Sequence, residues 1–225
     1  MSGLRQSLCL LLLSLAAVAA AQTPGLEGDQ IYRVATVRAA PGAFSDLIDW
    51  ARSGNGDEFY VARHSQGDHW DLMFIIPLAE VSIENPLAVV EPLIAFQEDM
   101  FAYGPEVDAL AEAYADNRLI HIEVFAALPG KKAALLEQRR MENNYLASTG
   151  QVENMIFDSV AGSDIDVFTI GFHKDLAAFA ASGPDSEEAG EKAAKAAGFK
   201  NRADLSFYLR SLIASHHDTL AGPVD

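Results

Sequence analysis

The chain has 225 residues, a formal net charge of −16 at pH 7 and a single cysteine, and half of its residues are hydrophobic. A chain this acidic is not expected to bind nucleic acid or an anionic membrane surface, because both repel negative charge. Its length and hydrophobic content allow one large domain or two small ones with a sizeable core and no covalent cross-links.

Residues 1–21 are predicted to be a secretory signal peptide. Arg5 supplies a positive start, an apolar run begins at Leu8, and Ala19-Ala20-Ala21 offers a cleavage site of small residues. The apolar run is shorter than the roughly 20 residues that a spanning helix needs, so no stable membrane insertion is expected after cleavage. Cleavage would also remove Cys9 and leave a net charge of −17. We therefore expect a periplasmic or secreted protein without disulfides.

The rest of the chain contains two similar segments. Residues 31–42 resemble residues 119–130 at an offset of 88, and both runs end in Pro-Gly. Residues 67–75 resemble residues 162–170 at an offset of 95, a difference that one loop insertion would produce. An internal repeat of this kind indicates two copies of one structural unit. We predict a first repeat at 22–118 and a second at 119–225, each with a helical tail.

The first repeat is expected to begin with a strand, since apolar and polar residues alternate from residue 32 until Pro41-Gly42. Apolar residues at helical spacing then predict a helix from Phe44 to Ala51. The remaining expected elements are strands over 58–63 and 72–76, and a helical tail over 87–115 that is broken at Gly104-Pro105.

The second repeat is expected to follow the same order. A strand is predicted where Ile120, Ile122 and Val124 alternate with His121, Glu123 and Phe125. The expected elements after it are a helix through Leu135 and Tyr145, strands over 154–160 and 167–172, and helices over 187–197 and 203–219.

This order of elements, and the segment from Lys132 to Phe172 in particular, resembles the dimeric α/β-barrel superfamily. Its members include antibiotic-biosynthesis monooxygenases, stress-responsive barrel proteins, NIPSNAP-type proteins and chlorite dismutases. The resemblance covers about residues 30–180. It implies an α+β fold of two tandem ferredoxin-like β-α-β-β-α repeats, packed sheet to sheet as an α/β barrel. Because relatives build this barrel by dimerising, a tandem chain is expected to be a monomer or a homodimer.

His121 and Glu123 are the predicted catalytic residues. They lie two apart in a predicted strand, so both project from the same face of the sheet. The face of Ile120, Ile122 and Val124 is more apolar and is expected to lie under the helices. His121 and Glu123 would then point between the two sheets, where an enclosed acid–base pair could transfer a proton. A solvated outer face or a structural ion pair is the alternative.

Four further residues are predicted to bind the ligand. Arg33 occupies in the first repeat the position that His121 has in the second. Tyr60 and His64 lie on the second predicted strand of the first repeat, and Asp158 lies on its counterpart. All four are expected to face the space between the sheets.

No metal site is predicted. The six histidines show neither H-x-x-x-H nor H-E-x-x-H spacing, and no cysteine remains to assist them. His216 and His217 are expected in a helix, where neighbouring side chains point about 100° apart and cannot chelate one ion. His216 is expected to be a half-buried histidine near the carboxyl end of that helix.

Two more polar sets are expected to be structural. Asp71 and Asp166 occupy equivalent positions after turn glycines, which is typical of residues that cap turns. A solvated helix face is expected for four polar residues: Arg139, Arg140, Asn143 and Asn144.

The sequence thus predicts an exported protein that binds a small, partly apolar molecule between its sheets. Resemblance to the monooxygenases implies cofactor-free oxygenation or proton transfer on that molecule. Resemblance to the chlorite dismutases implies an alternative, haem binding with His173 or His121 as axial ligand. A non-catalytic interaction module is the third alternative. Whether the chain is an enzyme, and which cofactor it would use, stay open.

Overall fold

The structure is a computed structural model that describes residues 25–53, 59–79, 84–181 and 183–224. The predicted signal peptide, residues 1–21, lies outside the described residues. None of the described helices combines the length and the apolar character that crossing a membrane requires.

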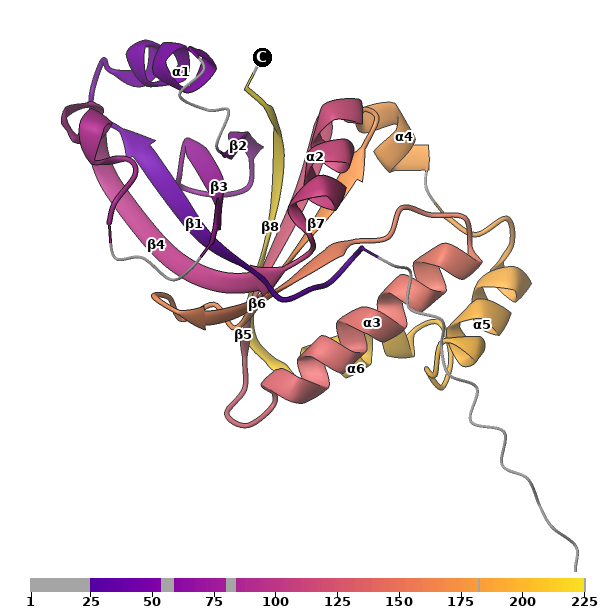
Figure 1. The fold of residues 1–225 in the computed structure, drawn as a ribbon. Helices are drawn as coiled ribbons and strands as arrows, with labels where there is room; N and C mark the ends of the chain where they lie inside the picture. The colour runs from indigo at the N-terminus through magenta and orange to yellow at the C-terminus, as the bar shows by residue number, and fades with distance from the viewer. Residues whose placement is uncertain (1–24, 54–58, 80–83, 182, 225) are drawn as a thin grey trace, which may run out of the picture.

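Within the described residues, eight antiparallel strands close into one barrel (Figure 1). Its order around the circumference is β1-β3-β2-β8-β5-β7-β6-β4. The strands are β1 (Gln30–Ala39), β2 (Tyr60–Gln66), β3 (Leu72–Leu78), β4 (Ile94–Gly104), β5 (Leu119–Ala127), β6 (Met155–Ala161), β7 (Val167–His173) and β8 (Ile213–Pro223).

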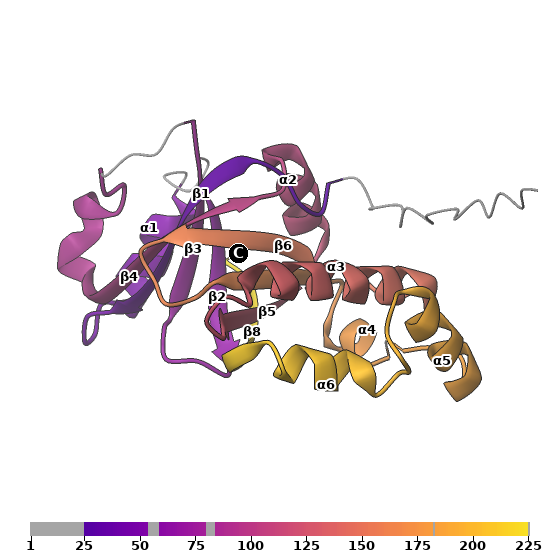
Figure 2. The same cartoon turned by 90° about the horizontal axis from the view of Figure 1, so that it is seen from below.

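The helices lie around this barrel in two separate groups, as the two views of Figures 1 and 2 show. Helix α1 covers one side, whereas α3, α5 and α6 gather on the other. The described helices are α1 (Phe44–Arg52), α2 (Val107–Asp116), α3 (Lys132–Ser148), α4 (Leu176–Ala181), α5 (Glu187–Ala196) and α6 (Asp204–Arg210), and a short 3₁₀ helix η1 spans Ala88–Leu93.

The barrel consists of two halves with matching strand order. The first half contributes β4-β1-β3-β2 and the second contributes β8-β5-β7-β6. Pairing of β2 with β8 and of β4 with β6 joins the halves. Each half thus has the ferredoxin-like order in which the first strand lies between the third and the fourth.

The fourth strand of each half was not predicted. The expected helical tail over 87–115 is instead η1, strand β4 and helix α2. The expected helix over 203–219 ends at Arg210, and β8 follows. Helical spacing of apolar residues does continue to Ile213, but β8 forms ladders with both β2 and β5. Barrel closure satisfies backbone groups on both edges of a strand, and this overrides local periodicity.

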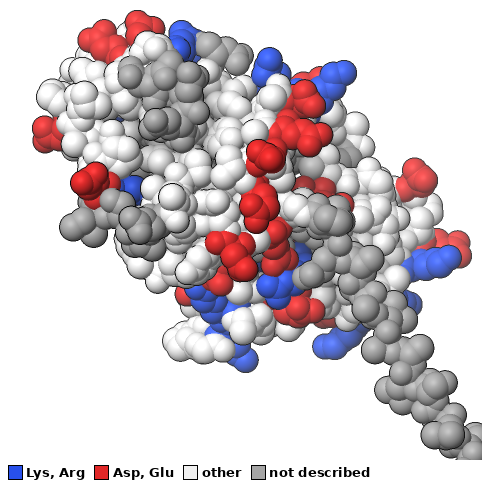
Figure 3. All heavy atoms as spheres, in the orientation of Figure 1, with Lys and Arg blue, Asp and Glu red and all other residues white. Residues whose placement is uncertain are grey.

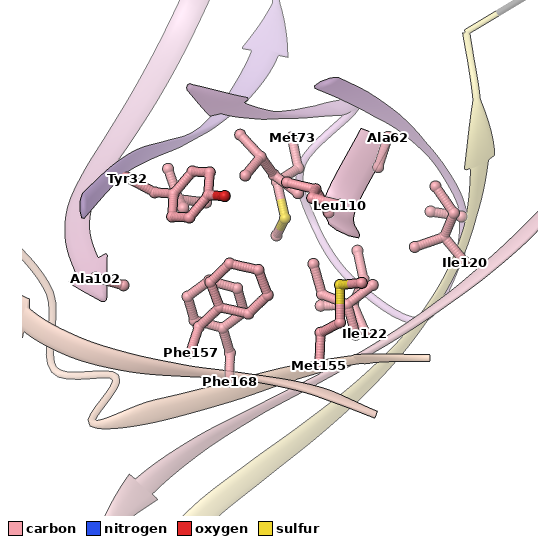
Figure 4. Close-up of a cluster of buried hydrophobic side chains, with 14 of the residues drawn as sticks. Tyr32, Ala62, Met73, Ala102, Leu110, Ile120, Ile122, Met155, Phe157 and Phe168 are labelled. Atoms are coloured by element: carbon pink, nitrogen blue, oxygen red, sulfur yellow. The ribbon is translucent and has the colours of Figure 1, made fainter. Parts of the chain in front are cut away.

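The barrel interior is a packed apolar core. Tyr32, Met73, Phe157 and Phe168 converge there (Figure 4), and the rings of Phe157 and Phe168 stack at 4.4 Å. Helix α2 packs across one end through the buried Leu110. The Tyr32 hydroxyl donates a hydrogen bond of 2.6 Å to the Pro105 carbonyl at the same end. The interior is therefore filled at its centre and closed at one end.

The predicted orientation of β5 was wrong. Ile120 and Ile122 point into the barrel, where they belong to the interior core. His121 and Glu123 point outward instead, on the same face as Phe125, which packs against α3. An interior lined from every strand accepts only apolar side chains at its centre, so the more apolar face of β5 turns inward.

The two halves make the same turn contacts. Asp71 accepts a hydrogen bond of 2.8 Å from the Ala39 amide, and Asp166 accepts one of 2.8 Å from the Ala127 amide. These carboxylates tie the third strand of each half to the end of the first. The two aspartates are structural, as predicted, but they bond amides 32 and 39 residues away instead of capping their own turns.

Two equivalent glycines lie where the halves meet. A Cβ atom on Gly67 would lie 2.2 Å from the Asp218 carbonyl oxygen, and one on Gly162 would lie 2.5 Å from that of Asp99. Both glycines have positive φ, at 113° and 95°. Only glycine allows the β2–β3 and β6–β7 loops to approach β8 and β4 so closely.

Candidate functional site

The end of the barrel opposite α2 contains a cavity of about 240 Å³, which we call the mouth cavity. It lies between the β2–β3 and β6–β7 loops and the ends of β1, β4, β5 and β8. Its apolar lining includes Val34, Trp70, Met73, Met100, Val124 and Ile165. Its polar lining includes Thr36, Asp68, His69, Glu98, Asp99, Asp164, Ser215 and His217.

Strand register explains which side chains reach this cavity. Thr36 pairs with Glu98 across β1 and β4, and Val124 pairs with His217 across β5 and β8. Each pair shares the face that the interior core occupies deeper in the barrel. Polar residues are tolerated here because the barrel opens to water at this end.

The acidic residues of the mouth cavity differ in how they are held. Asp68 accepts a backbone hydrogen bond of 2.7 Å from His69 and lies 2.6 Å from its ring nitrogen. Burial works against ionisation of Asp68, but these hydrogen bonds and one from Trp70 outweigh it and lower its pKa. Asp99 is already paired with Arg33 at 2.7 Å. No lysine or arginine lines the cavity among the residues that the structure describes.

A second candidate lies outside the barrel, between β5, β8 and α3. It comprises His121, Glu123, Arg139, Glu142, His216 and Asp218, and we call it the β5–β8 cluster. Glu123 lies directly opposite Asp218 in the ladder between β5 and β8. The distances are 3.3 Å from His216 Nε2 to Glu123 Oε1, 3.3 Å from His216 Nε2 to Asp218 Oδ1 and 3.4 Å from His121 Nε2 to Asp218 Oδ1.

Arg139 covers this cluster from α3 and is itself almost fully buried. Its guanidinium lies 4.7 Å from the centre of the Phe125 ring and 3.6 Å from Glu123 Oε2, and it also pairs with Glu142. The predicted solvated helix face is therefore wrong for Arg139, and it is wrong for the buried Asn143, which bonds Asn154. Helical spacing alone does not reveal that this face of α3 packs on β5 and on Asn154 before β6.

The pKa values in the cluster shift in different directions. Burial works against ionisation of Glu123, but His216, Arg139 and His121 outweigh it and hold its pKa below the ordinary value. Burial raises the pKa of Glu142, and the charge of Glu123 adds to this effect against the pull of Arg139. The hydrogen bond with Glu123 raises the pKa of His216. Glu123 is thus the carboxylate that the surrounding groups keep charged.

The predicted site residues do not converge on one space. Tyr60 and His64 are on the inward face of β2, but Tyr60 packs against Tyr114 at the end that α2 closes. His64 does not line the mouth cavity. Its ring lies 5.3 Å from the Trp70 ring and accepts a hydrogen bond from the Asp68 amide.

The remaining ligand candidates point outward. Arg33 pairs with Asp99 beneath η1 and donates to the Glu84 carbonyl. Asp158 pairs with Lys132 of α3 at 2.6 Å. The expectation that all these residues share one space was wrong, because it depended on strand faces that only barrel closure fixes. Their roles in binding or catalysis stay predictions.

Sequence reasoning missed His217, Ser215 and Glu98 as residues of the mouth cavity. Two of them were placed in a helix, and Glu98 was placed in a helical tail. Ser215 and His217 are two residues apart in β8, which is the spacing of one face of a strand. The apolar residues nearby also fit helical spacing, so this pattern did not identify the strand.

The two histidines predicted as haem ligands lie beside helix α4. His121 and His173 contact the Phe179 ring at 5.1 and 4.9 Å, and His173 is buried. Neither lines the mouth cavity. Haem binding through either histidine stays a prediction.

No protein-family model matches the chain. Solved structures nevertheless resemble it over most of its length. An anthrone oxidase-like protein matches with a TM-score of 0.59 and 12% identity, covering 89% of this chain and 94% of that one. A candidate monooxygenase from Lactobacillus acidophilus NCFM matches with a TM-score of 0.54 and 9% identity, over 88% and 95% of the two chains. A candidate chlorite dismutase matches with a TM-score of 0.51 and 11% identity, over 88% and 96%.

At these identities the likeness shows the fold alone. The chain has the ferredoxin-like α/β-barrel fold that monooxygenase-like and chlorite-dismutase-like proteins share. This supports the predicted resemblance at the level of the fold. A shared fold does not determine activity, which depends on the residues of the site.

Proposed function

We propose that this protein binds a small, partly apolar molecule that carries a cationic or hydrogen-bond-donating group. The observation that carries the proposal is the mouth cavity, in which an apolar base meets a rim of carboxylates. Binding sites for small molecules have this composition, since apolar contacts give affinity and a few polar groups fix orientation.

The volume of the cavity limits the ligand. A cavity of about 240 Å³ is smaller than most sites for drug-sized molecules, which start at about 300 Å³. An apolar cavity of about 150 Å³ is known to hold benzene. The mouth cavity therefore suits one substituted ring better than a large polycyclic molecule.

The charge of the lining selects among such rings. Asp68, Glu98 and Asp164 are acidic, and the described lining contains no lysine or arginine to balance them. Acidic side chains also form a band across the face shown in Figure 3. A protonated amine is attracted to this rim, whereas a carboxylate is repelled. His69 and His217 add imidazole groups that can exchange a proton with the ligand.

Fluorescence tests the proposal directly, because the Trp70 indole lines the cavity and is buried. Titration with 2-phenylethylammonium is expected to change the emission saturably, whereas phenylacetate, of similar size and opposite charge, binds at least tenfold more weakly. Ser215→Phe fills the cavity and is expected to abolish the response. Ala214→Phe, at the exposed neighbouring position outside the lining, is the matched control.

Equal binding of the amine and the carboxylate would contradict the role of the acidic rim. An unchanged titration in Ser215→Phe would exclude the cavity as the site. Failure of both molecules to bind would favour the non-catalytic interaction module.

Cofactor-free oxygenation or proton transfer is the activity that we propose for the same cavity. The names of two structural neighbours, an anthrone oxidase-like protein and a candidate monooxygenase, suggest it. The Glu98 carboxylate is a base at the rim, and the His217 imidazole can accept a proton and return it as an acid. Oxygen uptake with dopamine as probe, a single-ring amine that oxygen can oxidise, should then exceed the background rate and fall at least tenfold in His217→Ala. Uptake equal in the two proteins would contradict this activity.

Several finer predictions belong to this proposal. A catalytic role for His121 and Glu123 requires a substrate that reaches the outer face of β5. The matching strand order of the halves supports a tandem duplication, with repeats at 22–118 and 119–225. A NIPSNAP-type protein would have such a duplicated barrel. The amino-terminal sequence supports export to the periplasm or beyond. A monomer or a homodimer is the expected state.

A further inference from the structure

We propose that Glu123, His216 and Asp218 bind a first-row divalent transition-metal ion on the outer face of β5 and β8. One ligand atom from each of these residues lies within 4.8 Å of the other two. The site is separate from the mouth cavity, since none of the three residues lines that cavity.

The distances between these side chains fit ligands around one ion. His216 Nε2 lies 3.3 Å from Glu123 Oε1 and 3.3 Å from Asp218 Oδ1. Nitrogen and oxygen ligands bind zinc at about 2.0–2.2 Å, so neighbouring ligands of a tetrahedral ion lie about 3.3–3.6 Å apart. Two of the three edges of the ligand triangle already have this length.

The strands hold the ligands in place. Glu123 is directly opposite Asp218 in the ladder. His216 precedes Asp218 by two residues and lies on the same face of β8. The His216 ring stacks on Phe125 at 4.8 Å with an interplanar angle of 8°. Thr169 donates a hydrogen bond of 3.2 Å to the second oxygen of Glu123. Ligands fixed by sheet register and by such outer contacts lose little freedom on binding a metal.

The charges of the cluster favour a cation. Glu123, Glu142 and Asp218 bring three carboxylates, while Arg139 is the permanent cation paired with the first two. The three carboxylates and the guanidinium together carry a formal charge of −2, which one divalent cation would neutralise. Imidazole together with carboxylate favours zinc, iron, cobalt or manganese over calcium and magnesium, which prefer oxygen ligands alone.

His121 and Asp218 give the site its open side. His121 Nε2 lies 3.4 Å from Asp218 Oδ1, so it can orient this carboxylate or become a fourth ligand. The Asp218 side chain is 58% exposed, whereas that of Glu123 is 13% exposed. An ion can therefore enter from the solvent beside Asp218, and water can complete its coordination.

Binding of the metal alone tests the inference. The purified full chain is stripped with a chelator and titrated with Zn²⁺ by calorimetry, and with Co²⁺ by visible absorption. We expect one ion per chain, a Kd in the micromolar range or tighter, and the absorption of a four-coordinate Co²⁺ site. His216→Ala and Asp218→Asn are each expected to weaken binding at least tenfold.

His217→Ala is the matched control, because His217 is adjacent to His216 but lines the mouth cavity. This variant is expected to keep the wild-type Kd for Zn²⁺. Asp218→Asn is expected to fold normally, since its side chain is largely exposed, and circular dichroism checks this. Zn²⁺ should also raise the Tm of the wild type but not that of Asp218→Asn.

Three results would overturn the inference: no saturable binding by the wild type, undiminished binding by both His216→Ala and Asp218→Asn, or equal loss in His217→Ala. The outcome is independent of ligand binding at the mouth cavity, because Ser215→Phe should leave the Kd for Zn²⁺ unchanged.

Discussion

The outer layers of the two halves share a backbone but differ in chemistry. Under α1, the layer is an apolar cluster that includes Ala35, Val37 and Ala51. At the positions offset by 88 residues, the layer under α3 contains Glu123, Phe125 and Arg139. The same strand-and-helix frame therefore holds an apolar core on one side of the barrel and a charged cluster on the other.

The edge of each layer shows the same contrast. Arg33 pairs with Asp99 in the first half, and the register places His121 beside Asp218 at the equivalent positions of the second. A guanidinium neutralises its partner permanently, whereas an imidazole can be neutral and bind a metal. The second half has one more carboxylate and no fixed cation at this edge, so it offers groups that could bind a cation and the first half does not.

Removing Arg139 should produce the largest effect on stability. Arg139→Met leaves Glu123 and Glu142 buried without their guanidinium, and a broken buried pair typically costs about 3–5 kcal/mol. Urea unfolding of the metal-free protein measures this cost. Arg140→Met is the control on the same helix, because Arg140 is more exposed and pairs with Glu27 at 2.8 Å. A loss in Arg139→Met no greater than that in Arg140→Met would show that the cluster does not depend on Arg139.

Removing Arg33 should cost less than removing Arg139. Arg33→Met leaves a single carboxylate, that of Asp99, whose side chain is 28% exposed and can regain water. We expect a loss of about 1–3 kcal/mol in the same urea experiment. A loss equal to that of Arg139→Met would mean that the two layers depend on charge to the same extent.

The turn aspartates should affect the two halves equally. Asp71→Ala and Asp166→Ala each leave one backbone amide without its carboxylate acceptor, at a cost of about 1–2 kcal/mol. The two losses should agree within about 0.5 kcal/mol in urea unfolding. Asp71→Asn and Asp166→Asn keep an acceptor oxygen and should lose less. A large difference between the halves would show that the matching contacts are not energetically equivalent.

The smallest effect is expected at His173, where the first half has Leu78 at the equivalent ladder position. Burial lowers the pKa of His173, with His121 adding to the effect, and its Nδ1 atom has no hydrogen-bond partner among the described residues. The folded state therefore binds a proton less readily than the unfolded state. Stability that is present above the unfolded pKa, about 6.5, is lost as the pH falls below it.

His173→Leu should remove this loss. The unfolding free energies of the variant and the wild type are compared between pH 7.5 and 5, and the difference in favour of the variant should grow as the pH falls. Lys174→Leu, at the exposed neighbouring position, is the control. A difference that is constant over this range would show that His173 takes up protons equally in both states.

Local sequence patterns predicted much of the fold. The repeated strand, the Pro-Gly turns, the helix from Phe44, and the third strands over 72–76 and 167–172 all lie where the structure has β1, α1, β3 and their counterparts. These elements depend on residues close together in the chain, such as Gly42 and Gly130, whose positive φ values of 83° and 75° suit the turn. The predicted α/β barrel also agrees with the closed barrel of the structure.

The candidate sites were harder to predict. His121 and Glu123 were correctly placed on one face of a strand. That face was predicted to point into the barrel, but it points outward. His217 and Ser215 were assigned to a helix, although they line the mouth cavity. Both errors involve the pairing of β5 with β8, whose partners lie 86–101 residues apart and leave no local pattern.

The sequence by itself determined the strands other than β4 and β8, and the difference between the two halves, because alternation, turn residues and the residues at equivalent positions can be read directly from the chain. Only the tertiary structure decided which face of each strand is buried and that β4 and β8 are strands. Barrel closure imposes both, since it pairs every strand edge and reserves the interior for apolar side chains. The cluster of His121, Glu123, His216 and Asp218 exists for that reason: closure brings β8 beside β5 and turns their polar face outward.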